Sequence, residues 1–303
     1  MRADLPTAAN SARPRPRDVL ELLKPITWFA PMWAYMCGAV SAGVPWSGRW
    51  IELLFGLLIA GPLVCGTSQA WNDWFDRDVD ALNEPLRPIP SGRIPGSWGL
   101  YIGHATMLLS LLVGAWFGGA TLAAVAFGLA LAWAYSAPPL RLKMNGWVGP
   151  AAVALCYEGL PWFTGAAILL GRVPDGAILA IAALYSVGAH GIMTLNDFKA
   201  IDGDRQMGVR SLPAVHGADK AARIACAVMA APQLVVIGLL LAWGRPIQAL
   251  IIAVGLAAQA LAMRRLLTDP RRHAPWYNAT GTSLYVLGML VAAHALSTFA
   301  GAR

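Results

Sequence analysis

The segment WNDWFDRDVDALNEPLRPIPSGRIP (Trp71–Pro95) places four aspartates within eight residues, directly after an unbroken apolar run. That run, Ile51–Trp71, has about the length of a helix that crosses the hydrocarbon core of a bilayer. Acidic side chains at the end of a membrane helix are costly unless a cation balances them. The segment therefore indicates a membrane-spanning helix that ends in a cation-binding group of acids.

The composition of the whole chain supports a membrane protein. Hydrophobic residues make up 57% and charged residues 13% of the 303 positions, and a soluble domain usually carries about twice that share of charge. The apolar residues fall into runs long enough to span a bilayer. We expect nine such spans: Thr27–Val44, Ile51–Trp71, Leu100–Phe117, Ala120–Tyr135, Val148–Leu170, Ala177–Leu195, Ile224–Trp243, Ile247–Met263 and Thr282–Ala300. The predicted fold is an all-α membrane protein of nine transmembrane helices.

The N-terminal segment is polar and rich in Pro and Arg, and it contains no apolar core followed by a cleavage site. We expect a flexible cytoplasmic arm over residues 1–24 and a single transmembrane domain over residues 25–303. The four cysteines all lie within apolar runs and lack metal-ligand spacing, so we expect free thiols.

The basic residues predict the orientation of the chain. Only Arg49, Arg172, Arg245 and Arg303 fall on one side of the predicted spans, and the other 19 of the 23 Lys and Arg residues fall on the opposite side. The positive-inside rule places the richer side in the cytoplasm. We therefore expect a cytoplasmic N-terminus, a periplasmic C-terminus and a cavity that opens to the cytoplasm. The net charge of +7 reflects this topology and gives no reason to expect nucleic acid as a partner.

A second acidic segment lies on the same predicted side. Asn72-Asp73 is followed by Asp80, and Asn196-Asp197 is followed by Asp204, with the same step of seven residues between the aspartates. Such a repeat is expected if two similar four-helix units each contribute one acid-bearing helix end. A solvated loop would account for one such segment, but two matching segments favour a shared site.

The spacing of these residues suits a metal-bound anion. If the second span continues as a helix, Asn72, Asp76 and Asp80 share one face, and Asp78 lies on another. Asp202 joins Asp197 and Asp204 only if the chain bends at Gly203. Carboxylate and amide oxygens suit Mg²⁺, which also accepts phosphate ligands. The predicted metal ligands, which apart from Asp202 are also the predicted catalytic residues, are Asn72, Asp76, Asp80, Asp197, Asp202 and Asp204.

Facing sets of aspartates would hold a metal-bound diphosphate, and nearby cations would balance its remaining charge. The candidate cations are Arg77, Arg87, Lys143, Lys199, Arg205 and Arg210. Arg141, which precedes Lys143 in YSAPPLRLK, is a candidate for the same anion. Asp73, Tyr135 and Asn196 are further candidate substrate contacts.

The paired motifs resemble those of the UbiA-type intramembrane prenyltransferases, and most closely those of the chlorophyll and bacteriochlorophyll synthase branch. The resemblance rests on four blocks, and together these extend over about two thirds of the chain. They are LLKPITWFAPMWAYMCGAVSAG (22–43), NDWFDRDVDALNEPLRPIPSGRIP (72–95), AYSAPPLRLKMNGW (134–147) and NDFKAIDGDRQMGVRSLP (196–213). The first block favours the bacteriochlorophyll members. One departure is Ala200, where many members of the superfamily carry a further aspartate, so the second acidic segment relies on Asp197, Asp202 and Asp204.

The resemblance implies a nine-helix, Mg²⁺-dependent enzyme of the bacterial inner membrane. Its substrates would be bacteriochlorophyllide and geranylgeranyl or phytyl diphosphate, and it would esterify the pigment's propionate. A carboxylate is already ionised near neutral pH, so its attack needs no strong general base. Other pigment-biosynthesis or photosynthetic assembly proteins are candidate partners.

Two buried residues allow more than one interpretation. Glu158, within the fifth span, is a candidate to hydrogen-bond the pigment, or a protonated acid paired with a neighbouring helix. His190 lies seven residues before Asp197, and we expect it on the face towards the cavity. It is a candidate ligand of the pigment's central magnesium, or a hydrogen-bonded core histidine.

Two rival functions are also compatible with the sequence. A chlorophyll synthase, or a quinone-precursor or haem prenyltransferase, would share the motifs and differ in the acceptor. A cation transporter would also carry repeated units and acids at the membrane edge. Transport is disfavoured because the acids lie on one side only and no span has a matched charged pair at mid-depth.

Overall fold

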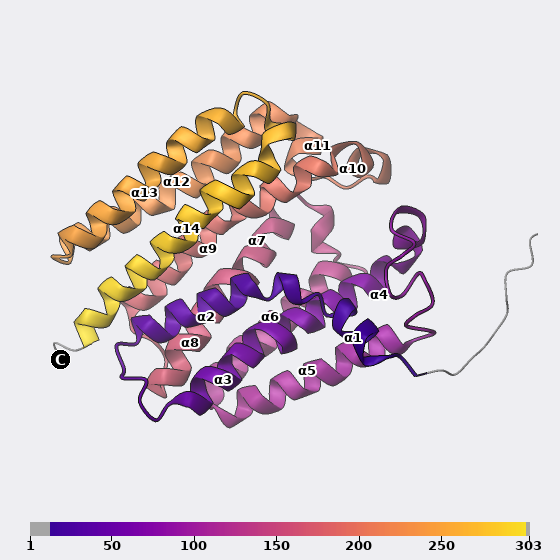
Figure 1. Cartoon of the computed structure of the whole chain (residues 1–303), viewed down its shortest axis with the longest axis horizontal. Coiled ribbons are helices and arrows are strands. Elements are labelled where there is room, and N and C mark those ends of the chain that lie inside the picture. Colours follow the sequence, from indigo (N-terminus) through magenta and orange to yellow (C-terminus); the bar gives the residue numbers. More distant parts are fainter. Residues whose placement is uncertain (1–12, 301–303) are drawn as a thin grey trace, which may run out of the picture.

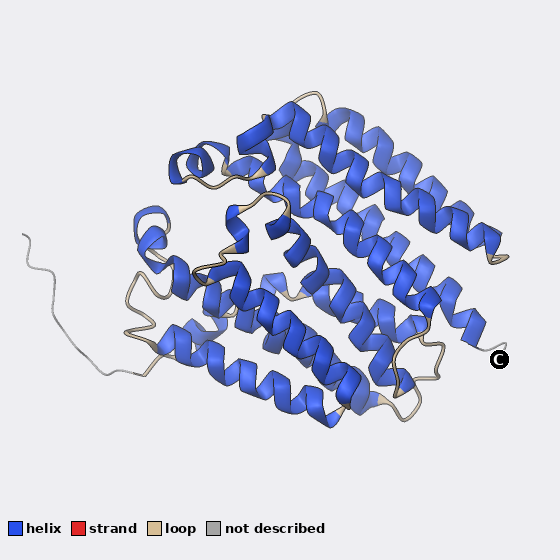
Figure 2. Cartoon of the chain, turned by 180° about the vertical axis from the view of Figure 1, so that it is seen from behind, coloured by secondary structure: helices blue, strands red, loops and turns tan. Residues whose placement is uncertain are grey.

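The structure is a computed structural model that describes residues 13–300, and within that range the elements are helices and no strand is formed. Figure 2 shows a bundle of helices joined by loops, and the described part contains no strand. Eight helical stretches are long and apolar enough to cross a membrane within the described range, which makes the chain a multi-pass membrane protein. They are Trp50–Asn83, Trp98–Trp116, Gly119–Ser136, Val148–Leu170, Gly176–Lys199, Ala218–Ala242, Pro246–Leu266 and Pro270–Thr298.

Each of these stretches overlaps one of the predicted spans, although the second continues 12 residues further and the last begins 12 residues earlier than predicted. The remaining prediction, Thr27–Val44, corresponds to α2 (Phe29–Ser41), which has 13 residues. At 1.5 Å per residue α2 is about 20 Å long, which is shorter than the hydrocarbon core. It is nevertheless packed inside the bundle, against α8 (Leu160–Leu170) and α14 (Pro270–Ala300). Gly38 and Gly165 allow this close approach, because a Cβ atom at either position would lie about 2 Å from the facing backbone.

Two of the spanning stretches contain π-helical turns. The second span consists of α3 (Trp50–Leu58), η2 (Ile59–Cys65) and α4 (Gly66–Asn83), and Pro62 lies inside η2. The fifth consists of α7 (Val148–Ala154), η4 (Leu155–Gly159) and α8, which has proline near its start. Proline has no backbone N–H to donate to the preceding turn, so the α-helical pattern is interrupted at both places.

The remaining elements complete the bundle. Figure 1 shows α9, α12, α13 and α14 on one side and α3, α5 and α6 on the other, with α2 and α8 between them. Helix α1, the end of α4, α10 and α11 gather at the end of the bundle opposite the C-terminus (Figure 1). The bounds not yet given are α1 (Pro16–Leu22), η1 (Pro25–Thr27), α5 (Trp98–Trp116), α6 (Gly119–Ser136), η3 (Leu142–Met144), α9 (Gly176–Asn196), η5 (Asp197–Lys199), α10 (Ile201–Met207), α11 (Leu212–His216), α12 (Ala218–Ala242) and α13 (Pro246–Leu266).

The first part of the chain differs from the predicted flexible arm. Residues 1–12 lie outside the described residues, but Pro16–Leu22 form α1. Leu22 is fully buried, and Arg93 binds both Asp18 (2.8 Å) and Glu21 (2.5 Å). Burial of one leucine and a bidentate ion pair with Glu21 hold the helix against the loop between α4 and α5.

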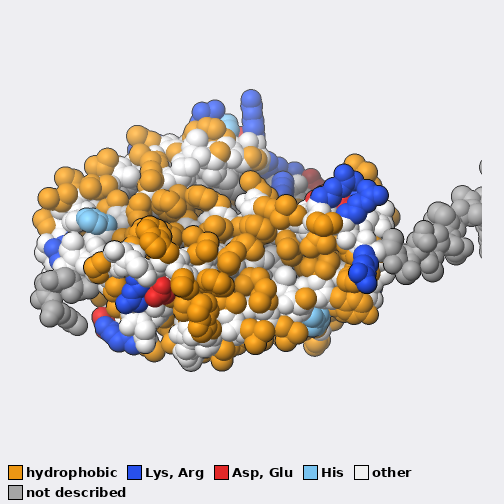
Figure 3. Space-filling view, turned by 60° about the horizontal axis from the view of Figure 1, so that its bottom comes forward, with side chains coloured by type: hydrophobic (Ala, Val, Ile, Leu, Met, Phe, Trp, Pro, Cys, Tyr) orange, Lys and Arg blue, Asp and Glu red, His pale blue; other side chains and the backbone are white. Residues whose placement is uncertain are grey.

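The surface matches a protein surrounded by lipid. Figure 3 shows a broad hydrophobic region across the middle of one face, and Lys and Arg side chains mainly towards its edges. Many large apolar side chains are exposed on the outer helices, among them Leu112 (69%) and Leu250 (64%). Such extensive apolar exposure is expected where the solvent is hydrocarbon. All four cysteines are free, as predicted.

Candidate functional site

The helix of the second span continues past the apolar run to Asn83, so Asn72, Asp76 and Asp80 lie on one face. Nδ2 of Asn72 donates a hydrogen bond to Oδ2 of Asp76 at 3.0 Å, the contact expected for residues four apart. The Asp78 side chain is 87% exposed and lies off this face. The helical register predicted for the first acidic segment is therefore confirmed.

Carboxylates from both acidic segments meet in one cavity of about 410 Å³. We call it the acidic cavity. Its charged lining comes from the end of α4, from the α6–α7 loop and from the segment after α9. These lining residues are Asp76, Asp80, Arg141, Lys143, Asp197 and Asp204. The predicted convergence of the two acidic segments is therefore present in the fold.

The cations of the acidic cavity contact its carboxylates directly. Nζ of Lys143 donates a hydrogen bond to Oδ1 of Asp76, and Nη2 of Arg141 lies 3.6 Å from the same oxygen. Burial lowers the pKa of Lys143, although the contact with Asp76 opposes this shift. An anion that enters the cavity would find two cations at its wall, both able to exchange a carboxylate for a phosphate oxygen.

Asp204 is held by a neighbouring hydroxyl. Oγ of Ser211 donates a hydrogen bond to Oδ2 of Asp204 at 2.5 Å. Burial raises the pKa of Asp204, and the hydrogen bond from Ser211 opposes that shift. Ser211 also lines the acidic cavity and was not identified from the sequence, although it lies within the block NDFKAIDGDRQMGVRSLP (196–213) that carries the second acidic segment.

The loops that follow Lys143 and Asp204 are joined by a parallel β-bridge between Asn145 and Arg210. The N–H of Gly146 donates to the carbonyl of Arg210 (2.8 Å), and the N–H of Arg210 donates to the carbonyl of Met144 (3.0 Å). A Cβ atom at Gly146 would lie 2.4 Å from the Leu212 nitrogen. Only glycine permits the two loops to approach this closely.

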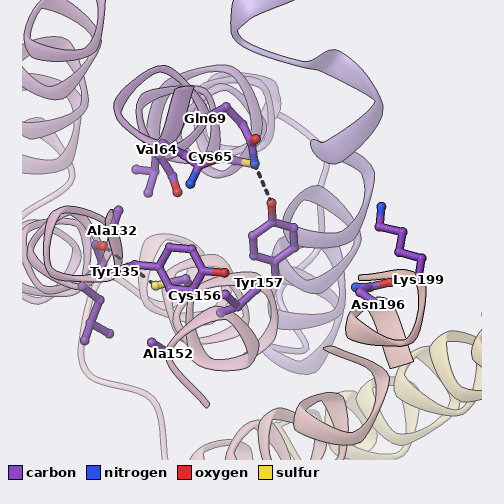
Figure 4. Close-up of a pocket in the computed structure, with 15 residues that line it drawn as sticks. Val64, Cys65, Gln69, Ala132, Tyr135, Ala152, Cys156, Tyr157, Asn196 and Lys199 are labelled. Atoms are coloured by element: carbon purple, nitrogen blue, oxygen red, sulfur yellow. Dashed lines mark hydrogen bonds between the residues drawn. The ribbon is translucent and has the colours of Figure 1, made fainter. Parts of the chain in front are cut away.

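A second cavity of about 490 Å³ adjoins the acidic cavity, and Tyr135, Val153 and Asn196 line both. We call it the inner cavity, and Figure 4 shows its lining. Asn72 and Lys199, both predicted site residues, also line it. Lys199 therefore lies beside the neighbouring cavity and not among the lining of the acidic one.

Further polar residues of the inner cavity, Ser68, Gln69 and Tyr157, were not identified from the sequence. Gln69 precedes Asn72 by three residues on α4, so extending the predicted polar face by one turn towards the membrane would have found it. Tyr157 lies within an apolar run, where a single tyrosine gives no signal of its own. Its position depends on the π-helical turn η4.

Three predicted residues of the second segment lie away from both cavities. The Asp202 side chain is 68% exposed and pairs with Arg271 at 3.0 Å, which lowers the pKa of Asp202. The bend at Gly203 that would bring Asp202 inwards is missing, because α10 continues through that position. The prediction of Asp202 as a cavity ligand is corrected accordingly. Arg205 is exposed and donates to the carbonyl of Ala214, and the Arg210 side chain is exposed.

Three predicted residues of the first segment contact neighbouring side chains at the end of α4 and line neither cavity. Asp73 is buried and binds Lys24 (2.6 Å) and Arg87 (3.4 Å). Arg87 also binds Asp80 at 2.8 Å. Burial lowers the pKa of Arg87, but the hydrogen bond with Glu84 and the nearby acids outweigh this effect and raise the pKa. Arg77 lies over the ring of Trp74 at 4.5 Å and does not line either cavity. Asp73, Arg77 and Arg87 are therefore placed beside the cavity lining.

Glu158 and His190 are also outside the two cavities. Glu158 is 3% exposed, and its Oε2 has no hydrogen-bond partner among the described residues. His190 lies in a separate groove with Trp147, and its Nε2 is 3.0 Å from the Trp147 carbonyl oxygen. The expectation that His190 faces the cavity of Asp197 is corrected, because its hydrogen bond turns it towards the start of α7.

The oxygen donors of the acidic cavity suit a hard divalent cation. Within residues 13–300, however, no group of three His, Cys, Asp or Glu side chains is close enough to hold a metal ion alone. Asp76 and Asp197 come from different helix ends and are both directed into one cavity. Such a lining fits an ion that takes some of its oxygen ligands from a substrate, as Mg²⁺ prefers.

Comparison with known proteins agrees with this geometry. Residues 28–298 match the UbiA prenyltransferase family. The chain is 61% identical to the bacteriochlorophyll synthase 33 kDa chain of Cereibacter sphaeroides, over 93% of this chain and 94% of that protein. It is 37% identical to the chloroplastic chlorophyll synthase of Oryza sativa, over 92% of this chain and 76% of that protein.

A solved structure shares the fold. The UbiA homologue from Archaeoglobus fulgidus bound to DMAPP and Mg²⁺ superposes with a TM-score of 0.71 and 19% sequence identity, over 90% of this chain and 99% of that chain. At that identity the likeness concerns the arrangement of helices. The helical bundle, the two converging acidic segments and the match over residues 28–298 agree, and the chain belongs to the UbiA prenyltransferase family, in its chlorophyll and bacteriochlorophyll synthase branch.

Proposed function

We propose that the chain is a bacteriochlorophyll synthase. It esterifies the propionate of bacteriochlorophyllide with the prenyl group of geranylgeranyl or phytyl diphosphate and releases diphosphate. The observation that carries this proposal is the 61% identity, over almost the whole of both chains, to a protein named bacteriochlorophyll synthase. The meeting of both acidic segments with Lys143 and Arg141 in one cavity supports it, because a diphosphate needs such balancing charges.

The residues of the acidic cavity would make diphosphate a good leaving group. Asp76 and Asp80 on one side, with Asn72 from the adjoining inner cavity, and Asp197 and Asp204 on the other, are the oxygen donors that would hold Mg²⁺. When bound, Mg²⁺ supplies positive charge that neutralises the diphosphate. Lys143 and Arg141 would bind the remaining phosphate oxygens.

The bonds of the reaction balance without a proton transfer. A propionate oxygen forms a bond to C1 of the prenyl group as the bond between C1 and the diphosphate oxygen breaks. The electron pair of the broken bond leaves with the diphosphate. Because the acceptor oxygen arrives already charged, the protein's contribution is to stabilise the leaving group and to hold the two reactants close together.

The placement in the membrane forms part of the proposal. We count α2 as a ninth span beside the eight long ones, since it is packed within the bundle. The distribution of Lys and Arg supports a cytoplasmic N-terminus and cavity, a periplasmic C-terminus, and the bacterial inner membrane as the location. Association with other pigment-biosynthesis or photosynthetic assembly proteins stays a prediction.

Product analysis tests the function. Membranes that contain the protein should be incubated with bacteriochlorophyllide or chlorophyllide, each with geranylgeranyl or phytyl diphosphate and Mg²⁺. We expect esterified bacteriochlorophyll, and 4-hydroxybenzoate and haem serve as alternative acceptors. Prenylation of either alternative without pigment ester would replace the proposal with another member of the family.

A further inference from the structure

The two π-helical turns of the bundle meet at the inner cavity. Cys65 is the last residue of η2 and Tyr157 lies in η4, and Sγ of Cys65 donates to the Tyr157 hydroxyl oxygen at 3.4 Å. π-Helical turns interrupt a regular helix and frequently lie at functional sites. Two such turns, from different spans, direct polar side chains into the same cavity.

The hydroxyl of Tyr157 is oriented by its neighbours. Nε2 of Gln69 donates a hydrogen bond to it at 3.1 Å, which Figure 4 shows as a dashed line. The oxygen of Tyr157 therefore accepts hydrogen bonds from Gln69 and from Cys65. The nearest acceptor for its own proton among residues 13–300 is Sγ of Cys65, and a thiol sulfur is a weak acceptor, so a carboxylate oxygen would compete for this proton.

The charges of the two cavities are opposite in kind. Four carboxylates and two cations, Arg141 and Lys143, line the acidic cavity, whereas Lys199 is the sole charged side chain among the described residues that line the inner one. No carboxylate in the described part of the chain lies within ion-pair distance of Lys199. An acidic ligand without metal would therefore meet an excess of negative charge in the first cavity and a positive charge in the second.

We propose that the inner cavity binds the carboxylate of the acceptor substrate, with Tyr157 as its hydrogen-bond donor and Lys199 as its counter-charge. The inference rests on the proposed esterification and adds the place where the acceptor's propionate binds. Tyr135 and Asn196 line both cavities, so the border between them is where a carboxylate in one cavity would face a prenyl diphosphate in the other. Gln69 is a positioning residue that fixes the Tyr157 hydroxyl.

A comparison of the affinities for two pigments distinguishes a role of Tyr157 and Lys199 in carboxylate binding from a purely structural role. The probes are bacteriochlorophyllide and its propionate methyl ester, which differ in the carboxylate charge. We expect the wild-type protein to bind the free acid at least about tenfold more tightly, as for a hydrogen bond to a charged group. Tyr157→Phe should reduce this preference to about threefold or less, and Lys199→Met should reduce it similarly.

The control is Tyr101→Phe, which removes a hydroxyl from a 61% exposed tyrosine on α5 and should keep the full preference for the acid. In steady-state kinetics Tyr157→Phe should raise KM for the pigment about tenfold and leave KM for geranylgeranyl diphosphate within about twofold.

An unchanged preference for the acid in Tyr157→Phe, or a rise in KM for the diphosphate alone, would overturn the inference. If Tyr157→Phe does not fold, Lys199→Met decides, because the exposed Lys199 supports no packing. Wild-type turnover is measured first. A wild-type protein that forms no pigment ester refutes the proposed function, whereas an active wild type with unaltered variants refutes only the carboxylate site.

Discussion

Nζ of Lys24 lies 2.6 Å from Oδ1 of Asp73, and this ion pair fastens the segment before the first span to the second span. The Asp73 side chain is 1% exposed, so protein cations must replace the water that its charge has lost. Arg87, at 3.4 Å, is the second cation. The acid at the start of the motif therefore supports the helix end that presents Asp76 and Asp80.

We predict that Lys24→Met destabilises the protein by about 1–3 kcal/mol, because Asp73 keeps a buried charge with one partner fewer. Thermal unfolding in detergent measures the effect. The double variant Lys24→Met/Asp73→Asn should recover part of the loss, since the buried charge is removed with its partner. Equal melting temperatures for the wild type and Lys24→Met would contradict the prediction.

Both acidic segments should be essential for turnover. Asp76→Asn and Asp204→Asn should each lower turnover at least about a hundredfold, because each removes stabilisation of the leaving diphosphate. Chelation by EDTA should abolish activity, and added Mg²⁺ should restore it. The matched control is Asp78→Asn, whose exposed side chain lies off the aligned face and should be much milder. Full activity in EDTA would exclude the metal-assisted mechanism.

Gly146→Ala should disturb the two loops at the acidic cavity. The new Cβ atom would lie 2.4 Å from the Leu212 nitrogen and 2.7 Å from the Arg210 carbonyl oxygen, so one loop must move. We expect kcat/KM to fall at least about tenfold as Lys143 and Asp204 lose their alignment. Gly203→Ala is the control, because open space surrounds its Cβ position on α10. Similar kinetics for both variants would show that the bridge does not align the loops.

His190→Gln should leave the chemical step intact. His190 bonds the Trp147 carbonyl and lies in a separate groove, so it is not placed to act as a general base. Turnover should stay within about tenfold of the wild type, which corresponds to roughly 1.4 kcal/mol. Steady-state kinetics provide the measurement. A loss of many hundredfold in turnover, with unchanged pigment affinity, would require a mechanism in which His190 takes part.

Labelling with an impermeant thiol reagent tests the orientation. Ser91 and Ser47 are exposed and lie in loops on opposite sides of the proposed second span. Ser91→Cys should react only from the cytoplasmic side and Ser47→Cys only from the periplasm, with the wild-type protein as the background for its four native thiols. Reaction of Ser91→Cys from the periplasm would reverse the topology.

Apolar run length predicted most of the fold, because a bilayer requires about 20 apolar residues per spanning helix. The spans at Val148–Leu170 and Gly119–Ser136 follow the predicted boundaries to within one residue. The short α2 shows where this rule fails. Its 13 residues pack against α8 and α14, and the run of apolar residues does not encode these contacts.

The sequence by itself determined the membrane class, the helical face of Asn72, Asp76 and Asp80, and the pairing of the two acidic segments. These features follow from composition and from the period of the α-helix, which are local properties of the chain. Tertiary structure alone decided which polar groups reach a cavity. It turned Asp202 towards Arg271 and His190 towards Trp147, and it brought Tyr157 beside Gln69 through a π-helical turn. Those outcomes depend on hydrogen bonds and ion pairs between segments that are distant in the sequence. The partners come within reach of one another only in the folded bundle, so local sequence patterns do not predict them.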